Sequence, residues 1–137
     1  MAANTAPIFG LTIAPTWIGT AMTSAETSMT APATYVTLGT AGTNGSYLFR
    51  IFAKALGTNV QSVLRVFVNN GSTPATAANN ALIKELTLPA TTASANSALV
   101  DIELGLNLKL PAGYKILLTI GTAVSAGWIC YGENSDY

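Results

Sequence analysis

Apolar and polar residues alternate with a period of two through most of the chain after residue 33. Such alternation is typical of β-strands that bury one face. No window of 11 or more residues carries the 3.6-residue repeat and the capping signals of an amphipathic helix. The strands that we expect span residues 8–13, 17–22, 34–40, 47–54, 61–69, 81–88, 98–104, 106–110, 114–120 and 127–132.

Turn residues separate these strands at intervals of about 8–12 residues, which indicates an antiparallel sandwich or barrel. We therefore predict an all-β fold, a single antiparallel β-sandwich or jelly-roll-like domain over residues 34–137. Residues 21–34 are small and polar and contain a single charge, Glu26. We expect residues 1–33 to form an extended N-terminal arm with one or two short strands. This arm either lies over a neighbouring molecule or is a flexible linker.

The most regular alternation lies in residues 46–71, where Gly57-Thr58 would make the two-residue turn of a β-hairpin. In that hairpin Phe49 would face Val66, and Ile51 would face Leu64, on one clean apolar face.

The other face of this hairpin mixes apolar side chains with arginines. A strand face exposed only to water would not carry four large apolar residues, so we expect another protein surface to cover it. The predicted interface residues are Leu48, Phe52, Val63, Phe67, Arg50 and Arg65.

Arg50 and Arg65 would lie directly opposite each other in the hairpin, and like charges in that position destabilise a sheet. Two explanations are open. Either the two strands are not neighbours, as can happen in a jelly roll, or an acid lies close to the arginines. Asp101 and Glu103, from this chain or from another copy, are the expected partners.

Composition narrows the class of protein. The chain has 137 residues, a formal net charge of zero and only 9% charged residues, against about 25% in typical domains. The basic residues do not cluster, so we expect no nucleic-acid partner.

Half of the residues are hydrophobic, but no apolar run reaches the ~20 residues of a membrane-spanning helix. Because so few charges repel a neighbour, we expect the protein to self-associate.

The chain offers little for catalysis, because it contains no histidine to serve as a general base or a metal ligand. It also lacks a nucleophile elbow and a Gly-rich phosphate loop. Asp101 and Glu103 alternate on one strand, about 7 Å apart, which a glycosidase pair would permit. Calcium could bind there or at residues 133–136. We favour solvated carboxylates, and we expect no enzymatic activity, no catalytic residue, no cofactor and no metal.

The remaining candidate residues have ordinary structural explanations. Cys130 is the single cysteine, and we expect it to be a small apolar residue within a strand. No Lys or Arg precedes the first apolar residues, so we expect no Sec export signal. Four aromatic residues could form a sugar-stacking platform, or could pack in the core and at its rim: Trp17, Trp128, Tyr131 and Tyr137.

Three segments together resemble small virion proteins of tailed bacteriophages, specifically capsid decoration proteins of the cement or head-fibre type. They are G-T-A-G-T-N-G-S at residues 39–46, V-L-R-V-F-V-N-N-G-S at 63–72 and L-P-A-G-Y at 110–114, with M-A-A-N-T-A-P-I-F at the start. The resemblance covers most of the chain from about residue 34, and the very low charge departs from it.

The resemblance implies a structural protein on the capsid exterior, made in the host cytoplasm and present in many copies. It implies a homotrimer that binds the major capsid protein and stabilises the capsid. The alternative that we retain is a tail-fibre or receptor-binding tip module that binds a host glycan.

Overall fold

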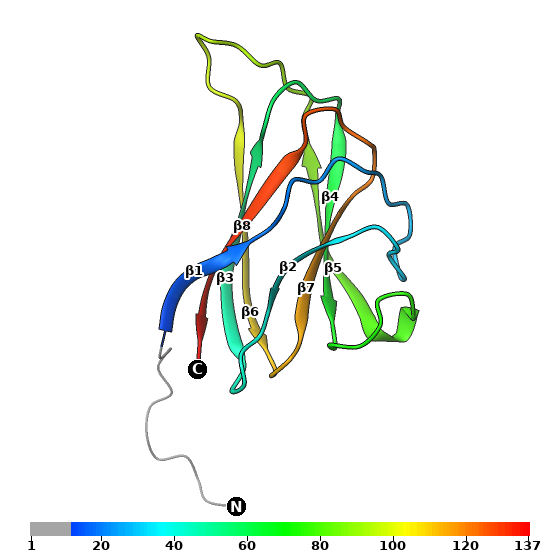
Figure 1. Cartoon of the computed structure of the whole chain (residues 1–137), viewed down its shortest axis with the longest axis vertical. Helices are drawn as coiled ribbons and strands as arrows, with labels where there is room; N and C mark the ends of the chain where they lie inside the picture. The colour runs from blue at the N-terminus through cyan, green and yellow to red at the C-terminus, as the bar shows by residue number, and fades with distance from the viewer. Residues whose placement is uncertain (1–11) are drawn as a thin grey trace, which may run out of the picture.

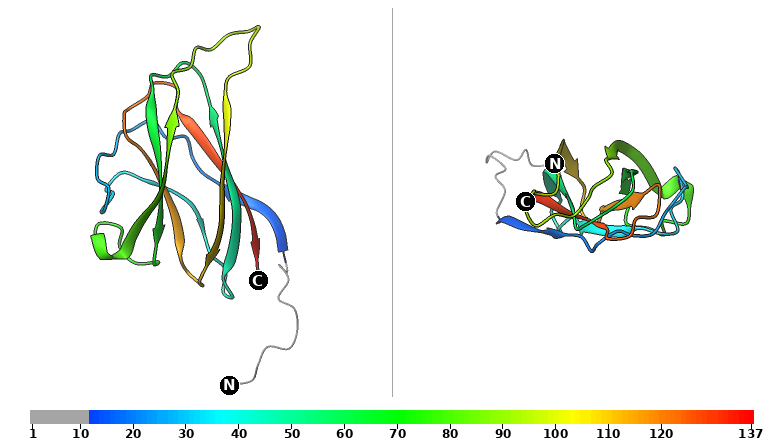
Figure 2. Two further views of the ribbon diagram at one scale, coloured as in Figure 1. Left: turned by 180° about the vertical axis from the view of Figure 1, so that it is seen from behind. Right: turned by 90° about the horizontal axis from the view of Figure 1, so that it is seen from above.

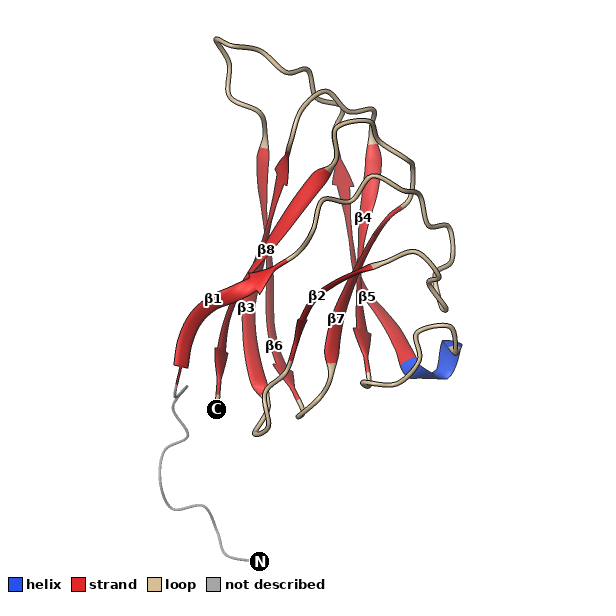
Figure 3. Ribbon diagram, viewed as in Figure 1, coloured by secondary structure: helices blue, strands red, loops and turns tan. Residues whose placement is uncertain are grey.

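Two four-stranded antiparallel sheets pack face to face in the computed structural model, which describes residues 12–137 (Figure 1). A short 3₁₀ turn, η1 (Ala77–Asn79), is the one helical element of this part of the chain (Figure 3). The predicted all-β sandwich is confirmed. Its strands are β1 (Thr12–Ile18), β2 (Val36–Thr40), β3 (Ser46–Ala55), β4 (Ser62–Asn69), β5 (Asn80–Leu88), β6 (Asp101–Leu110), β7 (Lys115–Ile120) and β8 (Trp128–Asp136).

The strand order is that of a jelly roll. Sheet A has the order β1-β8-β3-β6, and sheet B has the order β2-β7-β4-β5. The first strand therefore pairs with the last, the second with the seventh, the third with the sixth and the fourth with the fifth. A long antiparallel ribbon rolled up on itself gives these pairs, so the expected jelly-roll-like fold is confirmed.

The predicted hairpin of residues 46–71 is wrong, because β3 lies in sheet A and β4 lies in sheet B. The connection between them crosses from one sheet to the other and is held by Asn59. The Asn59 amide donates to the carbonyl oxygens of Gly57 and Gly127, and its oxygen accepts the Gly127 N–H. A buried side chain with these partners fixes a wide connection that a two-residue turn could not make.

The core lies between the two sheets. Ile51 and Leu64 are both fully buried there, as expected, but they come from facing sheets and are not cross-strand neighbours. The largest core side chains include Leu48, Ile51, Leu64, Val66, Ile116, Leu118, Ile120 and Trp128.

A β-bulge in β3 changes which side chains face the core. The register of β3 shifts between Leu48 and Arg50 against both neighbouring strands. Leu48 and Ile51 both point inward although they are three positions apart, and Phe49 is 41% exposed. Strict alternation predicted Leu48 outside and Phe49 inside, and both predictions are wrong because a bulge inserts one residue and inverts the faces.

Strand β8 is longer than the pattern predicted. We expected residues 133–137 to be a polar tail, yet β8 continues to Asp136 between β1 and β3. Backbone pairing with strands on both sides holds this polar segment in the sheet, and Asn134 and Ser135 are buried.

Residues 19–35, which we call the strap, connect β1 in sheet A to β2 in sheet B and close one side of the sandwich (Figure 2). The strap is bridged to Trp128 at Met22 and to Ile120 at Ala25. The expected arm of residues 1–33 thus contributes β1 to sheet A and most of the strap. The expected strand at residues 8–13 falls largely outside the described residues.

Candidate protein interface

The outer face of sheet A carries four aromatic side chains around one arginine. We call Tyr47, Phe49, Phe52 and Tyr131, with Arg50, the aromatic face. The ring centroids of Tyr47 and Phe49 lie 4.5 Å apart, and those of Phe52 and Tyr131 lie 5.9 Å apart. The Arg50 guanidinium carbon lies 5.2 Å from the centroid of the Phe52 ring. The bulge in β3 produces this surface, because it turns Phe49 and Arg50 outward together.

Arg50 is fixed by two carboxylates from the neighbouring strands. Its Nη1 lies 2.9 Å from Glu103 Oε1 on β6, and its Nε donates to Glu133 on β8. The hydrogen bond to Glu133 and then that to Glu103 raise the pKa of Arg50 above its usual value. The expected acid beside Arg50 is therefore confirmed for Glu103, and Glu133 is a partner that the sequence did not reveal.

A shallow depression of about 270 Å³ lies beside this ion-pair cluster. A Cβ placed on Gly105, at one side of the depression, would meet no atom within 4 Å. Asn107 has a positive φ of 51° and accepts a hydrogen bond from the Tyr47 hydroxyl over 3.2 Å. The lining residues are Phe49, Arg50, Glu103, Gly105, Asn107 and Glu133.

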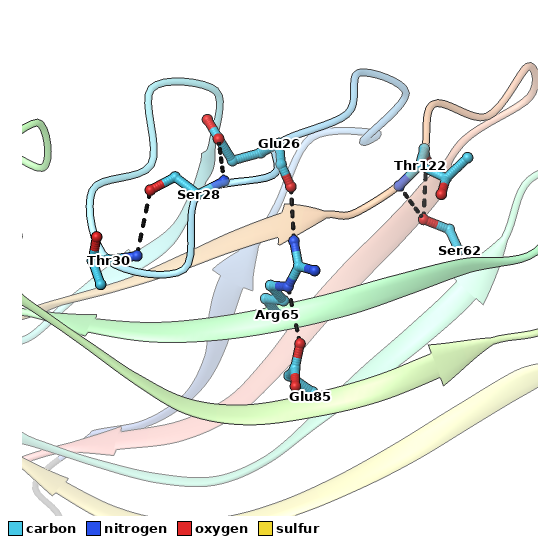
Figure 4. A network of polar contacts seen from close by, with 7 residues as sticks. All are labelled: Glu26, Ser28, Thr30, Ser62, Arg65, Glu85 and Thr122. Carbon is cyan, nitrogen blue, oxygen red and sulfur yellow. Dashed lines mark hydrogen bonds and ion pairs between the residues drawn. The ribbon is translucent and has the colours of Figure 1, made fainter.

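The outer face of sheet B, by contrast, is covered by the chain itself. Phe67 and Leu117 are cross-strand neighbours with no exposed surface, although they lie outside the core between the sheets. On one side of Phe67, Arg65 Nη1 donates to the Glu26 carbonyl over 2.8 Å (Figure 4). On the other side, the Asn80 amide donates to the Thr30 carbonyl over 3.0 Å. The strap therefore crosses this face and buries its centre at Phe67 and Leu117.

Glu26 organises the strap. Its carboxylate accepts backbone N–H groups from Ser28 at 2.8 Å and from Ala33 and Thr34 at 2.7 Å. The hydrogen bond from Thr34, followed by that from Ser28, lowers the pKa of Glu26. Its backbone N–H also donates to the Ile120 carbonyl, which ties the strap to β7. Sequence reasoning missed this role, and the available signal was a single charge in a long small-residue segment.

The structure separates the six predicted interface residues. Arg50 and Phe52 meet on the aromatic face. Leu48 and Phe67 are fully buried within the protomer, so neither offers surface to a partner.

The remaining two predicted residues lie on sheet B. Val63 is partly exposed there, and the Arg65 side chain is only 11% exposed. The acid beside Arg65 is Glu85, whose Oε1 lies 2.9 Å from Arg65 Nε (Figure 4), and not Asp101 or Glu103. The six residues do not form one surface, because β3 and β4 belong to different sheets.

The candidate catalytic carboxylates lie in ion pairs on the surface. Glu103 contacts Arg50, and Asp101 Oδ1 lies 3.8 Å from Lys54 Nζ. At the candidate calcium segment, Glu133 also binds Arg50, and Asp136 accepts the Ser46 hydroxyl over 2.5 Å. Within residues 12–137, no three His, Cys, Asp or Glu side chains gather closely enough to hold a metal ion.

The four candidate aromatic residues do not form a common platform. Trp17 and Trp128 are buried in the core, whereas Tyr131 lies on the aromatic face. Cys130 is buried in β8, which confirms it as a small apolar strand residue. Burial raises the pKa of its thiol to about 12, so the thiol stays protonated at neutral pH.

Comparisons with protein-family models, with curated proteins and with solved structures find no match for this chain. Over residues 12–137, the structure contains no helix of the length and apolar character needed to cross a membrane.

Proposed function

We propose that this chain is a structural virion protein of a tailed bacteriophage, which decorates the capsid and stabilises it by binding the major capsid protein as a homotrimer. It would be made in the host cytoplasm and would lie on the capsid exterior. The aromatic face is the observation that carries the proposal, because it is an open surface with the chemistry of a protein interface.

Aromatic side chains and arginine are enriched at protein interfaces and dominate their binding energy. Phe52 and Tyr131 offer large contact areas with few rotatable bonds to immobilise. Arg50 is already held in place by Glu103 and Glu133, so little further ordering of its side chain would accompany binding. Its ion pairs use two of its five N–H donors, which leaves the others for a partner.

The resemblance to decoration proteins supports the assignment to a virion. Two of the phage-like segments, residues 39–46 and 110–114, lie at the same end of the sandwich. There Ala41 N–H donates to the Tyr114 carbonyl, and Gly113 N–H donates to the Ala41 carbonyl. A jelly roll also occurs in viral capsid domains, although many functions share such a fold. The absence of histidine and the pairing of the surface carboxylates favour a structural role over an enzymatic one.

The proposal is tested with Phe52→Asp and phage capsids that lack this protein. We expect the variant to lose cosedimentation with the capsids, because it removes a large ring and buries a new charge in the centre of the aromatic contact. Its thermal unfolding should match that of the wild type, since Phe52 lies outside the core.

Tyr35→Asp is the matched control, because Tyr35 is an exposed aromatic residue of the strap that directly precedes β2 of sheet B, whereas the aromatic face lies on sheet A. It should bind capsids normally. Wild-type binding by Phe52→Asp, or equal loss in both variants, would contradict the aromatic face as the capsid contact.

One observation favours the alternative of a tail-fibre or receptor-binding module that binds a glycan. The depression beside Arg50 combines an exposed aromatic ring at Phe49 with donors and acceptors at Arg50, Glu103 and Asn107. The hydroxyl groups of a neutral sugar both donate and accept hydrogen bonds, so a sugar site needs acceptors as well as donors. Titration with methyl glycosides, followed by NMR, should then shift resonances around the depression, and Gly105→Leu should abolish the shifts by filling it.

A further inference from the structure

The strands β5 and β6 form an open side of the sandwich. β5 is an edge strand of sheet B, and β6 is an edge strand of sheet A. The other two edge strands, β1 and β2, lie on the opposite side of the sandwich, which the strap closes (Figure 2). Within the described part of the chain, β5 and β6 are not hydrogen-bonded to each other. Each therefore presents an unpaired edge, which proteins normally cover or protect.

The core reaches the surface along this open side. Ile102 and Leu104 on β6 point inward but stay partly exposed, whereas Ile51 and Ala53 on the neighbouring strand β3 are fully buried. The difference arises because no strand follows β6 in the sheet. We call the following residues the apolar seam: Ile83, Leu86, Ile102, Leu104, Leu106 and Leu108.

We propose that a second copy of this chain covers the apolar seam. The inference rests on the proposed function, since it names the contact that joins the copies, and it uses a surface distinct from the aromatic face. A continuous aliphatic row, joined to the core, is the kind of surface that self-associating proteins bury.

Charge indicates a second copy as the occupant. The two edge strands hold five of the chain's twelve charged side chains, and both signs occur on each strand: Lys84, Glu85, Asp101, Glu103 and Lys109. A surface of one sign would fit a partner of the opposite sign, whereas this mixed pattern complements itself.

The strand directions allow one specific pairing between copies. β5 and β6 run in opposite directions (Figure 3), so in a closed ring of copies β5 of one copy would meet β6 of the next in antiparallel orientation. Lys84 lies in the middle of β5 and forms no ion pair within residues 12–137, while Asp101 and Glu103 lie on β6. Glu103 is already paired with Arg50, so Lys84 of one copy would contact Asp101 of its neighbour.

Side-chain burial, and not a continuous backbone ladder, would hold this contact. The positive φ of Asn107 and the register shift opposite Leu48 and Arg50 interrupt the regular backbone of β6. Bulges of this kind prevent unlimited strand addition at an edge. They leave the aliphatic row of β6 available to a neighbour.

Charge reversal tests the proposal without touching the core. Lys84→Glu should weaken association by about tenfold or more, because it places like charges in contact. Adding Asp101→Lys to Lys84→Glu should restore association. Asp101 itself has only a long, exposed ion pair with Lys54, so its replacement should leave the protomer folded. Light scattering after size-exclusion chromatography measures the mass of each variant across a concentration series.

Lys115→Glu is the control, because Lys115 lies on β7, in the interior of sheet B, and β4 separates it from β5. This variant should associate as the wild type does. A wild type that is monomeric at every concentration would overturn the proposal, and so would a Lys84→Glu variant of unchanged mass or a double variant that is not restored. These results do not test the proposed function, which is measured separately by the binding of Phe52→Asp to capsids.

The wild type could also form a dimer that dissociates in Lys84→Glu and forms again in the double variant. That result would support the seam contact and contradict the trimer.

Discussion

Glu26 holds the strap through backbone groups and not through a cation. Its carboxylate accepts the N–H groups of Ser28, Ala33 and Thr34, and these bonds lower its pKa. A lowered folded-state pKa means that ionised Glu26 stabilises the fold above the pKa of the unfolded chain. That stability is lost as the pH falls through the lowered folded-state value.

Replacing Glu26 with Gln should therefore destabilise the protein in a pH-dependent way. At neutral pH we expect a loss of about 1.5–3 kcal/mol, because hydrogen bonds to a charged acceptor are replaced by weaker ones. The difference from the wild type should shrink as the pH falls through the lowered pKa of Glu26, because the wild-type carboxylate is then protonated as well. Urea unfolding at several pH values measures this difference. Asp101→Asn is the control: Asp101 has only a long ion pair with Lys54 on the surface, so its replacement should cost at most about 1 kcal/mol. A difference that stays constant with pH would contradict the role assigned to the ionised carboxylate.

Two glycines on different strands give a matched test of packing. A Cβ on Gly39 would lie 2.0 Å from Cδ2 of the buried Trp17 ring, whereas a Cβ on Gly105 would meet nothing within 4 Å. Gly39→Ala should lower the free energy of unfolding by about 1–3 kcal/mol through overpacking, and Gly105→Ala should change it little. Equal stabilities in chemical denaturation would show that the Trp17 packing is not as described.

Alternation predicts the facing of individual residues only where a strand is regular. It placed Ile51 inside, and Asp101 and Glu103 outside, and the structure agrees. It failed at Leu48 and Phe49 because the bulge of β3 depends on the register of two neighbouring strands. No pattern within β3 itself records that register.

At the scale of the elements, the strap accounts for the apolar residues on the outer face of β4. The sequence correctly indicated that something covers Phe67, but the cover comes from the same chain. The strap could not be predicted, because its residues are small and polar and its attachments are hydrogen bonds to backbone carbonyls and N–H groups. Such bonds leave no periodic signal in a sequence.

Removing the ring that the strap covers should loosen the strap. Phe67→Ala would leave a cavity beneath it and should cost about 3–5 kcal/mol, while Val63→Ala, at a partly exposed position on the same face, should cost less. Hydrogen exchange should become faster at the Ser28 and Thr34 amides in Phe67→Ala. Unchanged protection of these amides would contradict the covering role of the strap.

The pairing of β3 and β4 shows why topology was harder to predict than strand content. The existence of the strands follows from local alternation and turn residues, and most of them lie where the sequence predicted. Two consecutive strands have the same pattern whether they pair in one sheet or face each other across a core. The buried Asn59, which holds the wide connection between them, is an isolated polar residue in the sequence and gives no signal of its role.

At the scale of the whole molecule, the covered and open surfaces divide clearly. The strap buries the centre of the outer face of sheet B, whereas the aromatic face of sheet A and the apolar seam between β5 and β6 stay open. A subunit that binds both its own copies and a larger lattice needs two such surfaces. With only 9% charged residues, little electrostatic repulsion would oppose either contact.

The number of copies per virion tests the central claim most directly. Purified particles would be separated by gel electrophoresis, and the band of this protein would be compared by densitometry with those of the major capsid protein and of known tail components. A capsid decoration protein predicts a copy number of the same order as that of the major capsid protein. A copy number as low as that of the tail components would contradict decoration and favour the receptor-binding alternative.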